Sequence, residues 1–246
     1  MLWILVCLCV LVIASCHWLA VLISKKPPLQ QQCWASFGGG AGLAYVFIHL
    51  LPELASGGRT ISDAVGMQRY LPTEMTESLL FGVTLLGVLI PYASGVLLAQ
   101  KQRSIGWIGP IRLSTFALVS YLYAYSLPSL LTTGISYGLL FTLAISVHVL
   151  LADRTLASDH PLAFRRRFRW IGTAALFLGA IQAAVLHPIS DLHLAVATAF
   201  VGGGLLISVF REELPDAKHS SLSWFSMGLL TMMVLLLIAT ALHDHG

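Results

Sequence analysis

Charged side chains are scarce in this sequence. Asp, Glu, Lys and Arg together make up 10% of the 246 residues, whereas apolar residues make up 57%, and the mean hydropathy is +0.83. A soluble core of this length does not need so many apolar residues, but a bundle of lipid-facing helices does. The composition therefore excludes a soluble domain and predicts a protein that crosses the membrane several times.

Cysteines are also few. Cys7, Cys9 and Cys16 lie in the first apolar run, and Cys33 begins the second. This distribution disfavours a disulfide framework and indicates small apolar side chains. The formal net charge of +3 does not predict a nucleic-acid partner, because the basic residues lie in short loops between apolar runs.

The apolar runs lack the motifs of intramembrane enzymes. They contain no paired aspartates, no serine with a histidine suited to proteolysis, and no His-Glu-x-x-His sequence. Haem-binding helices would need facing histidines at matched depths, but His148 and Gln182 make a poor pair and His17 is isolated near the inner edge of the first run. We therefore expect a protein that is not an enzyme and has no bound cofactor.

Runs of about 20 apolar residues can cross a bilayer. We identify eight: Leu2 to Ile23, Cys33 to Leu54, Leu79 to Leu98, Leu113 to Leu131, Ser136 to Leu151, Trp170 to Leu186, Leu192 to Phe210, and Trp224 to Leu242. The first run lacks the basic start of a secretory signal and is followed by Lys25 and Lys26, so we interpret it as a retained anchor.

The basic residues are distributed unevenly between the loops. Of the 14 Lys and Arg residues, only Arg59 and Arg69 fall in one of the two alternating sets of loops. Because basic loops stay in the cytoplasm, this places both termini outside and the Arg165 to Arg169 loop inside. We expect a multi-pass protein of a bacterial inner membrane or a plasma membrane.

The stretch FGGGAGLAYVFIHLLPE, Phe37 to Glu53, occurs twice in related form. When the sequence is aligned with itself at one constant offset, identical residues fall on each other in the two copies. The matching pairs include Phe37 with Phe200, Gly39 with Gly202, Gly40 with Gly203, Val46 with Val209, and Pro52 with Pro215. Both copies are apolar helices whose glycines are expected to allow close packing. The predicted topology makes the two copies cross in opposite directions, which is typical of inverted repeats.

We therefore predict an all-α integral membrane protein with eight transmembrane helices in a 3+2+3 inverted-repeat arrangement. It forms a single transmembrane domain. Residues 1–100 form the first three-helix repeat, residues 101–163 carry the two central helices, and residues 164–246 form the inverted repeat.

With its second run reading GGGAGLAYVFIHLLPEL and its seventh AFVGGGLLISVFREELPD, the chain resembles the ZIP (Zrt/Irt-like) divalent metal transporters. The resemblance implies transport of a zinc- or iron-like cation, with helices two, four, five and seven as a core that alternates access. The fifth run, LAISVHVLLADRTLAS, is similar to the family's His-x-x-Pro-Glu-Gly motif, and His148 falls on its histidine. Leu151, Ala152 and Asp153 replace the remaining motif residues.

The fourth run also departs from the family pattern, which has a His or Asn followed by an acidic residue. This chain instead has hydroxyl groups there: Ser120, Tyr121, Tyr123, Tyr125 and Ser126. The family's two-metal centre therefore does not carry over to this chain.

The candidate metal ligands inside the membrane are His148, His49, Glu53 and Asp153, because His nitrogen and carboxylate oxygen bind zinc-class metals. His49 and Glu53 share one helix face, being four residues apart. Two alternatives stay open: a neutral His148 bonded to a tyrosine, and an Asp153 paired with its neighbour Arg154.

Further candidate ligands gather at the outer side. They are His187, Asp191, His193, His243, Asp244 and His245. They either collect dilute metal or are simply solvated polar residues near the membrane surface and the C-terminus.

Two other functions stay open beside divalent cation transport. The fold could serve a structural or interaction role without transport, with the Arg165 to Arg169 loop contacting anionic lipid or another subunit. It could also move another small solute along a tyrosine-lined path. The expected partners are the lipid bilayer and the metal ion, no nucleic acid is expected, and a homodimer stays open.

Overall fold

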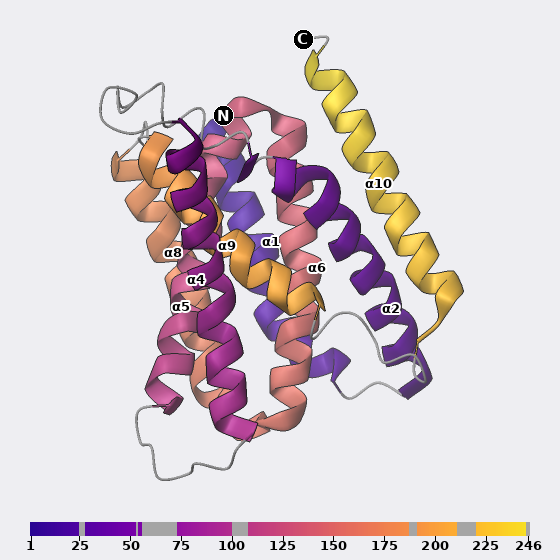
Figure 1. Cartoon of the computed structure of the whole chain (residues 1–246). Helices are drawn as coiled ribbons and strands as arrows, with labels where there is room; N and C mark the ends of the chain where they lie inside the picture. Colours follow the sequence, from indigo (N-terminus) through magenta and orange to yellow (C-terminus); the bar gives the residue numbers. More distant parts are fainter. Residues whose placement is uncertain are drawn as a thin grey trace.

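A computed structural model of the chain describes residues 1–24, 28–52, 54–55, 73–99, 108–186, 191–210 and 220–244. Within these ranges the chain is helical nearly throughout, and no β-strand occurs (Figure 1). The helices are α1 (Leu2–Ile23), α2 (Pro28–Tyr45) with its π-helical continuation η1 (Val46–Leu50), α4 (Thr73–Ala99), α5 (Ile108–Thr133), α6 (Ile135–Asp159), α7 (Pro161–Ala163), the π-helical turn η3 (Phe164–Phe168), α8 (Arg169–Leu186), α9 (Asp191–Ser208) and α10 (Leu222–Asp244).

The prediction of an all-helical protein is confirmed for the residues that the structure describes, and several of their helices are compatible with membrane crossing. Among the described residues, five helices have the length and apolar content to cross a bilayer: Leu2–Ile23, Gln32–Leu50, Met75–Ala93, Ile135–Ser158 and Pro161–Leu186. Ala195–Ile207 and Leu222–Ile238 are shorter apolar helices.

Helix α5 is less apolar than these five helices, but the polar side chains in its middle face the protein. Ser120, Tyr123, Tyr125 and Ser126 are all buried. Hydroxyl groups inside a bundle can satisfy one another or backbone carbonyls, so the helix does not expose them to lipid. Its polarity therefore reflects a central position.

Two helices extend furthest beyond the predicted apolar runs. The fifth run ends at Leu151, but helix α6 continues to Asp159, adding two turns that carry Asp153. At the other end of the bundle, α4 already begins at Thr73, whereas the third run begins at Leu79. In both places polar residues lie in a helix that extends past its apolar run, so hydropathy alone underestimates its length.

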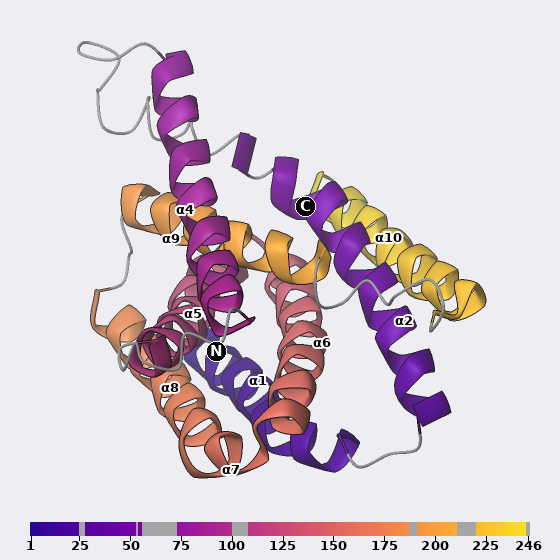
Figure 2. The same cartoon turned by 60° about the horizontal axis from the view of Figure 1, so that its bottom comes forward.

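Four helices form the centre of the molecule. Helix α5 packs along α8, α1 packs along α6, and α5 also contacts α6 while α1 contacts α8. Outside this group, α2 pairs with α10 and α4 pairs with α9. Figure 2 shows the α2–α10 pair lying side by side along one flank of the central helices.

Glycines allow the closest approach between α2 and α10. A Cβ atom added at Gly40 would collide with the backbone carbonyl of Phe225, and one added at Gly228 would collide with that of Phe37. Only hydrogen fits at these two positions, so each helix backbone rests directly on the other.

The α4–α9 pair is built in the same way. A Cβ atom at Gly203 would collide with the carbonyl of Thr84, and one at Gly87 would collide with that of Phe200. The repeat matches Phe37 with Phe200 and Gly40 with Gly203, so equivalent residues form equivalent contacts. The expectation that these glycines serve close helix packing is confirmed.

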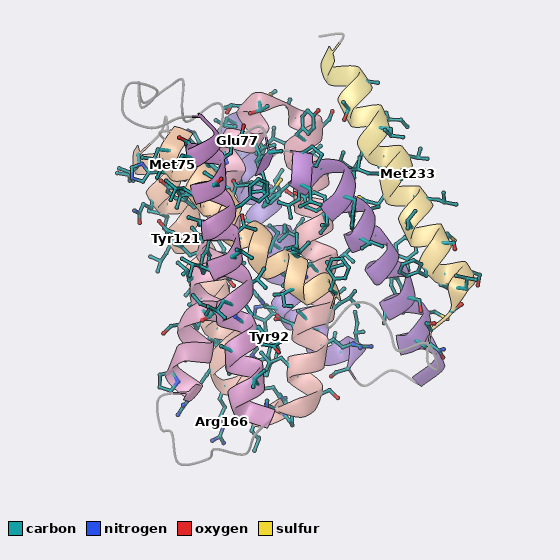
Figure 3. All side chains as sticks on the ribbon, viewed as in Figure 1. Met75, Glu77, Tyr92, Tyr121, Arg166 and Met233 are labelled. Carbon is teal, nitrogen blue, oxygen red and sulfur yellow. The ribbon has the colours of Figure 1, made fainter. Side chains whose placement is uncertain are left out.

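The ends of the chain and the arginines of η3 lie at opposite ends of the bundle. Helix α1 begins and α10 ends at the same end (Figure 1). Glu77 lies towards this end, whereas Arg166 lies at the opposite end (Figure 3). Which of these two ends faces the cytoplasm stays a prediction.

Candidate functional site

The most deeply buried ionisable groups that the structure describes form a pair between α1 and α6. His17 Nδ1 lies 2.5 Å from Asp153 Oδ2, and the two side chains are 1% and 3% exposed. The imidazole N–H donates to the carboxylate at this distance. A charge placed alone in the membrane is costly, so each residue gives the other its partner.

This pair corrects two sequence-based expectations. We had left open that Asp153 pairs with its neighbour Arg154, and we had considered His17 isolated at the inner edge of the first run. The two residues are 136 positions apart in the chain and meet because α1 packs along α6. A contact between such distant positions has no signature in local spacing.

The other ring nitrogen of His17 faces α8. A Cβ atom added at Gly172 would lie 2.8 Å from His17 Nε2, so the missing side chain makes room for the ring. The ring also packs against Phe116, with their centroids 5.5 Å apart. Within the described residues, Nε2 is buried and has no hydrogen-bond partner. It therefore offers a lone pair or a proton that nothing described there uses.

His148 lies on the same helix as Asp153, half-buried and about one and a half turns before it. It is near enough to interact electrostatically with the Asp153 carboxylate. Its ring meets the ring of Tyr123 edge to face, with centroids 6.3 Å apart. Two of the candidate metal ligands, His148 and Asp153, thus share one neighbourhood with His17.

His49 lies elsewhere. Its ring stacks on that of Tyr137, with centroids 5.5 Å apart, and tilts against that of Tyr45 at 5.2 Å. Tyr137 precedes His148 by eleven residues of α6, which is roughly 16 Å of helix axis. Metal–nitrogen bonds are about 2 Å long. His49 and His148 therefore do not converge on one ion in this arrangement.

The remaining candidates fall partly outside the structural description. Glu53, His187 and His245 lie outside the described residues, and for Asp191, His243 and Asp244 only the helical backbone is described. His193 is exposed on α9. Across the described ranges, no three His, Cys, Asp or Glu side chains are grouped so that they could hold a metal ion.

A small cavity lies between α2 with η1, α5, α6 and α9, the four helices that the resemblance implied as a core. Its volume is about 20 Å³, enough for one water molecule. Tyr45, Ser126 and Thr198 supply its hydroxyl groups, and its other lining residues are apolar. The cavity therefore lacks the ligands that a zinc-class ion prefers.

The sequence matches no family model and no curated protein. The resemblance to ZIP transporters therefore rests on the quoted motifs alone.

His17 is the functional candidate that sequence reasoning missed. One signal was available, because His17 is the only Asp, Glu, His, Lys or Arg in the first apolar run. An ionisable residue inside a membrane span needs a partner, and Asp153 and Glu53 were among the few acids near the apolar runs. The sequence pattern could have suggested that His17 has an acidic partner, but it could not have shown whether that partner is Asp153 or Glu53.

Proposed function

We propose that this chain is a ZIP-like transporter of a divalent cation, built from eight membrane-crossing helices in a 3+2+3 inverted repeat. The observation that carries the proposal is the buried Asp153–His17 pair with His148 beside it, inside the central helices. Intramembrane groups of this kind usually serve the passage of ions or protons.

The packing supports an inverted repeat. In an inverted repeat of this layout, α1 corresponds to α8, α2 to α9, α4 to α10, and α5 to α6. Under this correspondence the contact between α2 and α10 is equivalent to that between α9 and α4. The contact between α1 and α6 is likewise equivalent to that between α8 and α5. The glycine contacts follow the same correspondence, since Gly40 on Phe225 corresponds to Gly203 on Thr84. Such pairing is typical of transporters whose two halves cross the membrane in opposite senses.

A route for exchange follows from the chemistry of the pair. Without a cation, Asp153 and His17 satisfy each other. A divalent cation reaching Asp153 would compete with the imidazole N–H for the carboxylate, and His148 on the same helix would be the neighbouring ligand. Because histidine must be unprotonated to bind a metal, cation entry would release protons, and uptake should rise with pH.

Zinc flux into sealed liposomes, reported by an interior dye, tests the proposal. Saturable uptake should be lost in Asp153→Asn and in His148→Ala, because each removes a group from the buried cluster. The matched control is His160→Ala, which removes an exposed histidine that is not a candidate ligand and should keep uptake near that of the wild type. Zinc uptake that persists in both Asp153→Asn and His148→Ala would contradict the assignment of these residues to the transport site.

A second candidate is the same fold without transport. It is favoured by the central cavity, whose polar groups are only hydroxyls, and by Leu151 and Ala152 in the metal-motif positions. In that case the wild type moves zinc, iron, manganese and cadmium no faster than empty vesicles leak them. Asp153→Asn would then lower the thermal stability of the protein. It would leave the zinc flux unchanged, because the wild type would show none above leakage.

A further inference from the structure

The helix turn before α8 presents three arginines to the surroundings. In η3, the side chains of Arg165, Arg166 and Arg167 are all exposed, whereas Phe164 and Phe168 at its two ends are buried. The two phenylalanines pack in a cluster with α1, α5 and α6 residues and hold the turn in place. The arginines are therefore fixed to a rigid element at the basic end of the bundle (Figure 3).

A fourth arginine is ordered by two tryptophans. The guanidinium carbon of Arg169 lies 4.4 Å from the ring centre of Trp18 and 5.8 Å from that of Trp170. The two indoles meet edge to face, with centroids 4.8 Å apart. The Trp18 indole N–H donates to the Thr173 hydroxyl at 3.3 Å, which fixes the ring under the guanidinium.

This arrangement leaves hydrogen-bonding capacity unused. Arg169 Nε is buried and has no partner among the residues that the structure describes. The Arg169 side chain as a whole is only partly buried, and its stack on Trp18 fixes the guanidinium before a ligand arrives. Its outer N–H groups are therefore pre-organised to bind a planar or tetrahedral oxyanion.

The position of Arg169 in the fold indicates which kind of molecule would carry that oxyanion. Trp18 and Trp170 are 38% and 55% exposed at the end of two membrane-crossing helices. Tryptophans at this level usually mark the boundary between lipid tails and head groups. Leu11 and Phe177, each exposed about two helix turns from Trp18 and Trp170, continue an apolar surface along α1 and α8 towards the bilayer interior. An anion held here would therefore be attached to hydrocarbon chains.

We propose that Arg169, stacked on Trp18, and the arginines of η3 bind the phosphate of an anionic phospholipid in the leaflet on this side of the membrane. Arg169 donates to the phosphate, Arg166 and Arg167 supply attraction, and the acyl chains lie along α1 and α8. This site is separate from the proposed transport function and holds whether or not the chain moves a cation.

Fluorescence quenching in vesicles tests the site. The reporter protein keeps Trp18 and Trp170 and carries Phe at Trp3, Trp34, Trp107 and Trp224. It is reconstituted in phosphatidylcholine vesicles with increasing fractions of brominated phosphatidylglycerol, or of brominated phosphatidylcholine. Half-maximal quenching should need a roughly tenfold smaller fraction of the anionic lipid, as expected of a few interfacial arginines.

Three variants distinguish binding at this site from general attraction to positive charge. Arg166→Gln/Arg167→Gln should remove most of the preference, whereas Lys101→Gln/Arg103→Gln, which removes the same charge from another basic loop, should keep it. Arg169→Lys keeps the charge but loses the flat stack on Trp18, so it should also weaken the preference. Equal loss in both double variants, an unchanged Arg169→Lys variant, or no preference in the reporter protein would overturn the proposal.

Discussion

Breaking the buried pair between α1 and α6 should destabilise the fold more than removing the pair altogether. In His17→Leu the Asp153 carboxylate stays in a site where it is 3% exposed, without the imidazole N–H that now lies 2.5 Å away. Leaving one member of a buried ion pair without its partner costs about 3–5 kcal/mol. For a chain of this length the midpoint of thermal unfolding should fall by roughly 6–20 °C.

The double variant His17→Leu/Asp153→Leu removes both charges and restores apolar packing. Replacing a buried ion pair by apolar residues is often neutral or stabilising, so this variant should unfold within about 1 kcal/mol of the wild type. The assay is reversible unfolding in mixed micelles, followed by circular dichroism, for the wild type, both single variants and the double variant. His193→Leu serves as the control, because it replaces an exposed histidine.

The double-mutant cycle decides the result. A favourable coupling of several kcal/mol between the two substitutions means that the two residues depend on each other in the folded protein. If the effects of the two single variants simply add, the pair does not act as a unit, and the reasoning about the site is refuted.

Three further predictions concern packing and topology. Gly40→Ala and Gly203→Ala should each cost about 1–3 kcal/mol, because the new Cβ meets a backbone carbonyl, whereas Gly82→Ala, which meets nothing within 4 Å, should not destabilise; equal stability of all three in micelles would contradict the packing. Phe164→Ala should cost about 3–5 kcal/mol because the ring is fully buried, while Leu162→Ala on the exposed side of the same segment should stay within about 0.5 kcal/mol; denaturant unfolding measures both. A membrane-impermeant maleimide applied to intact cells should label Glu77→Cys but label Arg166→Cys only after permeabilisation, and the reverse pattern would contradict the predicted orientation.

Hydropathy predicted the helices because membrane crossing imposes a length of apolar sequence that few other structures need. It failed at the ends of α6 and α4, where polar residues continue the helix beyond the apolar run. The end of an apolar run marks a change of solvent, and a helix does not have to stop there.

The repeat was informative because it compares two stretches within one chain. Matching Phe37 with Phe200 and Gly40 with Gly203 predicted close helix packing, and the structure has it at both places. The partners, Phe225 on α10 and Thr84 on α4, could not be named from the motif. Which helix a glycine faces depends on how all the helices assemble.

The candidate site was only partly predictable. Asp153 and His148 were identified from a weakened motif, and on α6 they lie near enough for an electrostatic interaction. His17 was missed because its partner lies in another helix. His49 was grouped with His148, but His49 contacts Tyr137, which lies roughly 16 Å along α6 from His148. Sequence spacing gives neighbours on one helix but does not give the register between helices.

The most direct test of the proposed function is cation uptake by the wild-type protein in sealed vesicles, recorded together with the interior pH. The account predicts saturable zinc entry that exceeds leakage into empty vesicles, slows as the external pH is lowered, and disappears in Asp153→Asn. Zinc entry that equals the leakage at every pH, or that continues unchanged in Asp153→Asn, would contradict it.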